Sequence, residues 1–389
     1  MHRSKNIAAR SGFTLLEIMI ALTVGGIALT SIYAIGSAST RHFQGQQRIS
    51  AAQTSLRTAM AQLKHDFARA GFMSSPNTRL PGEVCSEPSN VEDRWVGAVN
   101  RYVKHATKPT QLDPDDLNPK PTDFFTVDEV WLTGNFATSG EYPNISLSSD
   151  GLVVTVPMGW QSFQRDFAEW SGPSTADCNA TVFQAAFPDD RLVRLHAQNG
   201  MFFYSRISST TCVGGLTSAA TITLKDAVPI GCNMNGGWIA PVNTMFYRAV
   251  NAEGVEDDML KRNVVLRRSE VMPSARGTLL TATVGSDKIY VDDRALLDYV
   301  VRFSVDFFGA FNGPAVSHVA MTQAEWQSNP QRIRGVLLDV AVRTPQQETD
   351  FTADVPSAAF RLYQGLGAAR VRRLRAELLL PNVANRNLE

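Results

Sequence analysis

The sequence has no excess of charge of either sign, because 37 lysines and arginines balance 37 aspartates and glutamates. Domains that bind nucleic acid usually carry a basic excess, so we expect no nucleic-acid partner. Three motifs of reactive sites are also absent: the Gly-x-Ser-x-Gly turn, the Gly-x-x-x-x-Gly-Lys phosphate loop and the His-Glu-x-x-His metal motif. We therefore expect the chain to be no enzyme and to need no cofactor.

Histidine is scarce and scattered, and no Cys-x-x-Cys pair or Cys/His cluster occurs. The spacing of these residues therefore predicts no zinc or other metal site. His65 and Asp66 are adjacent in a segment with helical periodicity, so we expect their side chains to point to different faces of the helix. The six histidines are His2, His42, His65, His105, His196 and His318.

Proline is absent from Met1 to Ser75, so no residue there forces a break in a helix. An apolar run extends from Phe13 to Ile35 with Glu17 as its only charged residue, and a helix of that length covers a bilayer core of roughly 30 Å. Beyond it, apolar residues at steps of three and four form one helix face up to Ala70: Ile49, Ala52, Leu56, Met60, Leu63, Phe67 and Ala70. The pattern predicts one helix over 13–70, membrane-spanning over 13–35 and stopped by Gly71.

The residues ahead of the apolar run are basic. His2, Arg3, Lys5 and Arg10 precede any acid, which places the arm on the cytoplasmic side and the rest of the chain across the membrane. A carboxylate inside a spanning helix requires a partner. A cut between Gly12 and Phe13 would create an α-amine about one helical turn from Glu17. An ordinary signal anchor with one acid is the alternative, and a secretory signal cleaved near residues 34–38 is another.

This start resembles the N-terminus of type IV prepilins, in which a short basic leader ends at a glycine and Phe-Thr-Leu-Leu-Glu follows, here over residues 13–17. The resemblance implies that residues 1–12 are a leader that a prepilin peptidase removes after Gly12. It also implies that Phe13 is then N-methylated. Glu17 is expected to meet an N-terminal amine, within the chain or on a neighbouring subunit.

All four cysteines follow the apolar run, on the exported side, where an even number predicts two disulfides. Three pairings are possible, and the sequence alone does not choose among them. We favour Cys212 with Cys232, because this bond closes a short loop between strand-like segments. Cys85 would then pair with Cys178.

Short runs of β-branched and aromatic residues, bounded by turn residues, predict strands in the later part of the chain. They are Asp128–Thr133, Leu152–Pro157, Leu192–His196, Met201–Ile207, Ala220–Leu224, Trp238–Val250, Asn263–Arg268, Thr278–Val284, Val301–Phe307, Val336–Val342 and Leu374–Leu380. The predicted fold class is α+β: a long helix packed on a large β-rich head over 71–389. Four aromatic residues at helical spacing, Trp160, Phe163, Phe167 and Trp170, favour core packing over a ligand surface.

Later segments resemble PilW-type minor pilins. Residues 296–309 and 332–343 resemble two of their strands, and the end of the chain, with Arg386 and Asn387, resembles their Arg-Asn finish. Residues 62–72 resemble the helix end of both PilW-type minor pilins and J-type pseudopilins. The segment from about 74 to 290 matches nothing in that family and is expected to be a large insertion.

The resemblance implies a minor pilin that primes assembly of a type IV pilus and belongs to its tip complex, where it presents an adhesin. The implied partners are the other minor pilins, the major pilin, the prepilin peptidase and a large PilY-type tip adhesin. The precursor is expected in the bacterial inner membrane as a single-pass protein with a periplasmic head, and later at the pilus tip. The alternatives are a J-type pseudopilin of type II secretion, or an enzyme or lectin head on a pilin-like anchor.

Overall fold

The first element is a long helix, α1 (Leu15–Arg69), whose start is capped by its own residues. Thr14 and Glu17 form a reciprocal capping box: the Thr14 amide donates to Glu17 Oε2 at 2.9 Å, and the Glu17 amide donates to Thr14 Oγ1 at 3.3 Å. Hydroxyls in the apolar run do not break the helix, because they donate to carbonyls one turn back. Thr30 Oγ1, for example, lies 2.7 Å from the Gly26 oxygen.

The computed structural model of the chain describes residues 13–74, 85, 98–103, 126–170, 176–214, 219–251, 264–271, 290–309, 319–322, 325–326, 329–345, 359–360 and 369–384. The leader 1–12 with Gly12, and the predicted strand Thr278–Val284, lie outside these residues. The chain divides into two units, Met1–Gln53 and Thr54–Glu389. The second unit holds the last turns of α1 and the β-rich head.

Among the described residues, all strands of the head except β6 and β7 belong to one 16-stranded sheet, in which β11 (Trp238–Asn251) joins two parts. From Asn243 to Tyr247 β11 pairs with β2, whereas from Trp238 to Val242 it pairs with β8. The first part contains β1 (Val99–Val103), β2 (Thr126–Gly134), β12 (Val264–Val271), β13 (Tyr290–Leu297), β14 (Val300–Gly309), β15 (Val319–Ala320), β16 (Ile333–Arg343), β17 (Ala359–Phe360) and β18 (Ala369–Leu379). Its pairs are antiparallel except for the short contact of β14 with β2.

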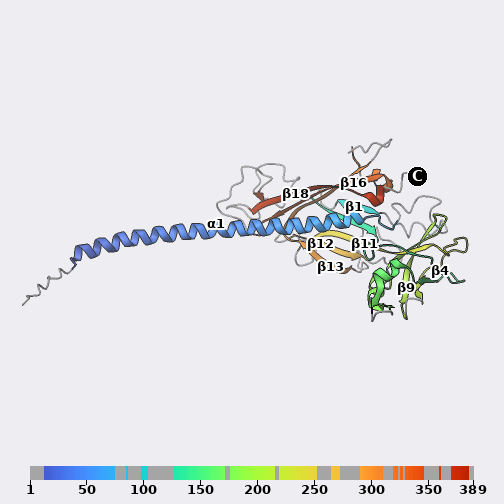
Figure 1. The fold of residues 1–389 in the computed structure, drawn as a ribbon. Helices are drawn as coiled ribbons and strands as arrows, with labels where there is room; N and C mark the ends of the chain where they lie inside the picture. The colour runs from blue at the N-terminus through green and yellow to red at the C-terminus, as the bar shows by residue number, and fades with distance from the viewer. Residues whose placement is uncertain are drawn as a thin grey trace, which may run out of the picture. The chain divides into compact units, whose positions relative to one another are not determined.

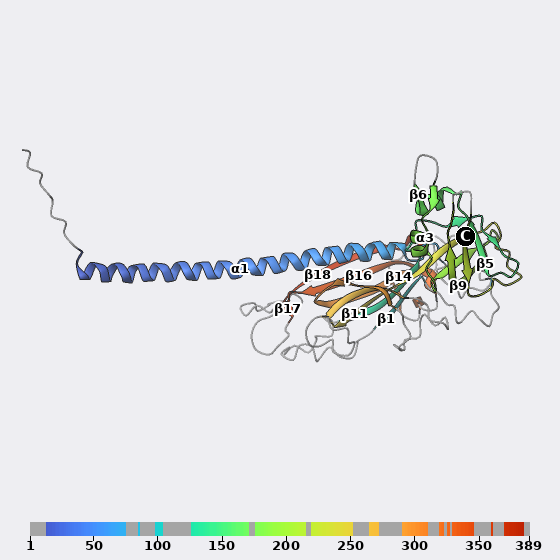
Figure 2. The ribbon, with the colours of Figure 1, turned by 90° about the horizontal axis from the view of Figure 1, so that it is seen from below.

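The last turns of α1, residues 54–69, pack along this first part of the sheet (Figure 2). Leu63 and Phe67 on the predicted apolar face are fully buried, and the Phe67 ring stacks near Tyr247 of β11 with centroids 6.5 Å apart. Burying aromatic and aliphatic side chains of this size contributes roughly 1.5–3 kcal/mol each. The predicted packing of the long helix on a β-rich head is therefore confirmed.

The second part of the sheet lies past the C-terminal end of α1 (Figure 1). It contains β3 (Tyr142–Pro143), β4 (Ser146–Leu147), β5 (Val153–Pro157), β8 (Leu192–His196), β9 (Phe202–Thr211) and β10 (Ala219–Leu224). Two short helices, α2 (Gln161–Phe167) and α3 (Ala180–Ala186), cover its core, and β6 (Ala168–Trp170) pairs with β7 (Ala176–Cys178). Phe163, Phe167, Phe183 and Phe187 pack together there around Tyr142.

The strands predicted from residue patterns are confirmed wherever the structure describes them, with shifts at their ends. In β14, for example, Val301, Phe303, Val305 and Phe307 are all buried, as the alternation predicts. Within the predicted insertion 74–290, residues 135–242 build the second part of the sheet, while β1, β2 and β12 belong to the first part.

Two disulfides are present, but the predicted pairing is wrong. The bonds join Cys85 to Cys232 and Cys178 to Cys212, not Cys212 to Cys232. β9 and β10 form an antiparallel hairpin, with Cys212 at its turn end and Cys232 beyond the other end of β10. The six residues of β10 alone span about 20 Å, far more than the roughly 7 Å limit between the Cα atoms of a disulfide.

Candidate functional site

The first candidate site is the start of α1. Phe13 is exposed and precedes the helix, and Thr14 Oγ1 donates to Glu17 Oε2 at 3.0 Å. The Glu17 carboxylate therefore lies at the N-terminal end of the helix, held by Thr14 through both its amide and its hydroxyl. A negative charge is favourable at this end, where backbone N–H groups lack partners within the helix.

A second polar site lies where the end of α1 meets the first part of the sheet. Asp66 is almost fully buried and accepts from Tyr247 Oη at 2.5 Å and from Arg268 Nε at 2.6 Å. Gln62 Nε2 donates to the same carboxylate at 3.0 Å. Burial and the charge of Asp66 raise the pKa of Tyr247 well above its usual value, so the phenol stays protonated and donates. The site ties the helix to β11 and β12.

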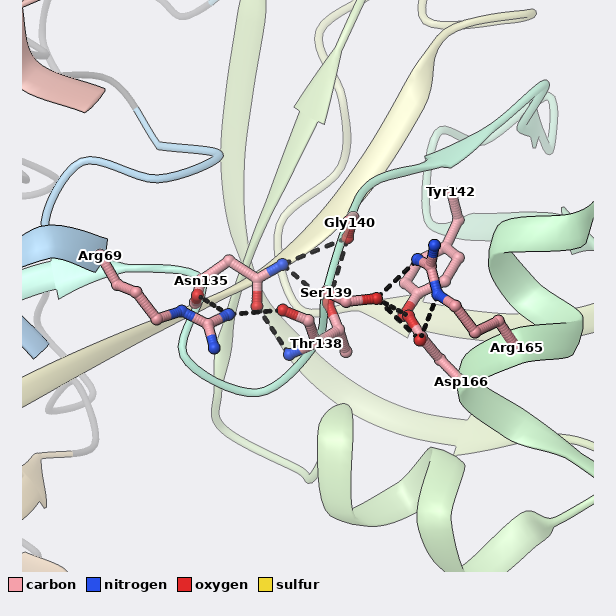
Figure 3. A network of polar contacts seen from close by, with 8 residues as sticks. All are labelled: Arg69, Asn135, Thr138, Ser139, Gly140, Tyr142, Arg165 and Asp166. Atoms are coloured by element: carbon pink, nitrogen blue, oxygen red, sulfur yellow. Dashed lines mark hydrogen bonds and ion pairs between the residues drawn. The ribbon is translucent and has the colours of Figure 1, made fainter. Parts of the chain in front are cut away.

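A third polar site surrounds the loop 135–141, which joins β2 to β3 (Figure 3). Arg69, the last residue of α1, donates from Nη2 to the carbonyl oxygens of Asn135 at 2.7 Å and Thr138 at 2.6 Å. The Asn135 side chain closes the loop on itself, accepting from the Thr138 amide at 2.9 Å and donating to Thr138 Oγ1 at 2.7 Å.

The far side of the same loop is held by α2. Asp166 accepts from Ser139 Oγ and from Tyr142 Oη, each at 2.8 Å, and pairs with Arg165 Nε at 3.1 Å (Figure 3). Burial alone would raise the pKa of Asp166. The hydrogen bonds from Arg165, Ser139 and Tyr142 outweigh burial and hold that pKa below its usual value. The loop is therefore fixed between the end of α1 and the second part of the sheet.

The comparison with known families adds one result. Residues 7–33 match the model described as the prokaryotic N-terminal methylation motif. This chain is a pilin-like protein with a prepilin-type N-terminus. No curated protein and no solved structure gives a significant match.

For a pilin-like chain, the motif implies processing by a prepilin peptidase and assembly with other pilins. In the part of the chain that the structure describes, α1 is the one helix long and apolar enough to cross a membrane. Together, motif and helix indicate inner-membrane anchoring before assembly. Gly12 lies outside the described residues, and the roles predicted for Phe13 and Glu17 remain predictions.

His65 and Asp66 lie on different faces of α1 as expected: the His65 side chain is 62% exposed and the Asp66 side chain is 1% exposed. Even so, His65 Nδ1 lies 3.0 Å from Asp66 Oδ1. In the aromatic stripe, Phe163 and Phe167 are core residues as favoured, whereas Trp160 is 47% exposed.

Asp66 and Arg69 were not predicted from the sequence to have structural roles. One signal for Asp66 was available: it lies beside Phe67 on the apolar side of the predicted helix, and a carboxylate there requires donors. For Arg69 the signal was its position two residues before Gly71, because a basic residue in the last turn commonly satisfies nearby carbonyls.

Proposed function

We propose that the chain is a PilW-like minor pilin that primes assembly of a type IV pilus and occupies the tip complex. The observation that carries the proposal is the prepilin motif at the head of α1, a helix whose last turns pack on a large β-rich head. The chain acts by assembly with other pilins, without an active site of its own. Presentation of a large PilY-type adhesin is the role that such a tip subunit would serve.

The position of the second part of the sheet supports a place at the tip. This part lies past the C-terminal end of α1, and two disulfides and an aromatic core stabilise it. In a fibre of stacked helices, a domain beyond the helix end occupies the space that the next subunit would need. A subunit at the tip has no such neighbour above it.

Two other functions account for fewer of these features. A J-type pseudopilin of type II secretion would share the prepilin start and the helix end. The resemblance of residues 296–309 and 332–343 to strands of PilW-type minor pilins favours the minor pilin. A lectin or enzyme head would be favoured by a cleft into which the rings of the aromatic stripe are exposed, but Phe163 is 0% exposed and Phe167 is 2% exposed.

The test of the proposal is Glu17→Gln in the bacterium that makes the pilus. The amide keeps an acceptor for Thr14, so the cap persists, while the charge that would neutralise a neighbour's amine is lost. We expect a stable protein, cleaved to begin at Phe13 and bound to the membrane, but reduced at least tenfold in sheared pili, with few pili made.

Thr23→Val is the matched control, because Thr23 is a polar residue of the same apolar run and donates only to carbonyls of its own helix. It should enter sheared pili at the normal level, as measured by quantitative mass spectrometry. Normal entry of Glu17→Gln would contradict the proposed role of the charge. An intact Met1 terminus on the pilus-associated wild-type protein would contradict processing.

A further inference from the structure

The head contains a cleft of about 650 Å³ at the junction of the two parts of the sheet. Its walls come from the end of α1, the loop 135–141, α2, α3, β11, β12 and β13. This volume lies within the range of ordinary ligand sites. One wall is apolar and partly exposed, formed by residues such as Phe136, Val182 and Ala185.

The acids that line the cleft are already paired. Glu270 receives Nε and Nη2 of Arg191 at 2.9 and 2.8 Å. Asp166 pairs with Arg165, and Asp292 pairs with Arg294 at 2.5 Å. Of the lining cations, Arg268 is paired with the buried Asp66 behind the wall. These groups leave little charge to attract a ligand.

Arg69 differs from the other lining arginines. Among the residues that the structure describes, no carboxylate lies within ion-pair distance of its guanidinium, whose Nη2 donates only to the two loop carbonyls. Carbonyl groups fix the position of the cation but do not neutralise it. Burial lowers the pKa of Arg69 against the opposing influence of the more distant Asp66. Arg69 is thus a positioned, partly desolvated cation facing a cleft.

We propose that this cleft binds an acidic peptide segment of a partner protein, with the peptide carboxylate on Arg69 and an aliphatic side chain against Val182 and Ala185. A guanidinium held in place by its neighbours can pair with a carboxylate through its remaining N–H groups at little entropic cost. Val182 and Ala185 are exposed and aliphatic, whereas Phe136 in the same lining is half-buried and Phe167 is buried. The wall therefore offers more exposed surface to an aliphatic peptide side chain than it offers aromatic surface to a sugar ring. The proposal does not depend on the proposed pilus function.

The first experiment measures binding of small probes to the full-length mature protein in detergent by isothermal titration calorimetry. The probes are N-acetyl-leucyl-glutamic acid amide, its neutral glutamine analogue, and N-acetyl-leucyl-leucine with a free C-terminal carboxylate. We expect at least tenfold tighter binding of the better carboxylate probe than of the neutral analogue. Whichever of these two probes binds more tightly shows whether the cleft prefers a side-chain carboxylate or a C-terminal carboxylate. Equal binding of all three, or stronger binding of N-acetylneuraminic acid, would overturn the proposal.

Variants locate the site. Arg69→Gln replaces the guanidinium with a shorter, neutral amide, and should weaken the acidic probe at least tenfold. Ala185→Trp fills the cleft from an exposed position and should do the same while leaving Arg69 intact. Lys64→Gln, on the exposed side of the same helix, is the matched control and should bind normally. Unchanged binding in Arg69→Gln and Ala185→Trp would overturn the proposal.

Discussion

The buried carboxylate of Asp66, near the end of α1, is contacted by four side chains. Tyr247, Arg268, Gln62 and His65 all lie within 3.0 Å of it, and the side chain is 1% exposed. A buried charge is tolerated only when it is paired and hydrogen-bonded. This carboxylate therefore fixes the position of the helix against β11 and β12.

Asp66→Asn should destabilise the head by about 3–5 kcal/mol, because the amide group sets a donor against Arg268 and leaves that cation buried without its partner. Urea unfolding followed by circular dichroism measures the change. Asp190→Asn is the control: its partners Lys225 and Arg206 are near the surface, so the loss should be about 0–1 kcal/mol. Equal losses in the two variants would contradict the role given to Asp66.

Asp339 of β16 gathers three arginines on the sheet. Arg302 Nε lies 2.8 Å from the carboxylate, Arg373 Nε lies 2.6 Å from it, and Arg375 Nε lies 3.2 Å from it. Burial raises the pKa of Asp339, but the hydrogen bond from Arg373 and the charges of the three arginines outweigh burial and leave the pKa below its usual value.

A pKa that is lower in the folded state adds stability above the unfolded value of about 3.9, and this stability is lost as the pH falls through the folded value. We expect Asp339→Asn to cost about 1.5–3 kcal/mol at pH 7, where the partly exposed arginines limit the loss. The difference from wild type should shrink as the pH is lowered from 4 to 2. Urea midpoints at pH 7, 4, 3 and 2 check this, and a difference constant over that range would contradict it.

The end of α1 is the element on which the head converges. Gly71, with φ of +77°, turns the chain, and its amide donates to the Thr133 oxygen of β2 at 2.9 Å. Asn382, in the short helix α5 (Pro381–Ala384), donates from Nδ2 to the Ala68 oxygen at 2.7 Å. Gly134 of β2 comes so close that an added Cβ would lie 2.7 Å from the Arg69 oxygen. Only glycine permits this approach of helix end to strand.

Gly71→Ala should destabilise the head through two effects. A left-handed backbone costs an alanine about 1–2 kcal/mol, and the new methyl group would also lie 3.1 Å from Val383 Cγ2. Gly200→Ala separates the two effects, because Gly200 also has a positive φ but has open space around its Cβ position. We expect a larger loss of unfolding free energy for Gly71→Ala in urea titrations. A larger loss for Gly200→Ala would contradict the crowding at the helix end.

At the scale of the whole molecule, β11 makes one sheet of two differently stabilised parts. The first part gains its stability from packing under α1. The second part lies past the helix and depends on its aromatic core and its disulfides. Because the two parts are stabilised by different contacts, a pilin-like chain can carry the second part without altering the part that packs on α1.

Non-reducing peptide mapping should recover Cys85 linked to Cys232 and Cys178 linked to Cys212. In the chain-entropy model, loops of 147 and 34 residues correspond to about 5 and about 4 kcal/mol. Replacing both Cys178 and Cys212 by serine should therefore destabilise the second part of the sheet by up to about 4 kcal/mol. The protection of this part from proteolysis measures the change. A Cys212–Cys232 peptide would contradict the structure, and an unchanged rate of proteolysis would contradict the stabilising role.

The sequence by itself determined the elements, because their signals lie in neighbouring residues. The lack of proline and the three-and-four spacing from Ile49 to Ala70 predicted α1, and the alternation from Val301 to Phe307 predicted β14. The motif at Phe13–Glu17 is equally local, which is why the prepilin-type start could be recognised without a structure.

Only the tertiary structure decided which distant residues meet. Cys85 is bonded to Cys232, and its amide donates to the Phe202 oxygen at the start of β9. Cys178 is bonded to Cys212, and its amide donates to the Gly214 oxygen. The division of β11 between β2 and β8, and the cleft at Arg69, depend on the same long-range pairing. Short-range spacing carries no record of such contacts, since they arise from the order in which strands pair across the sheet.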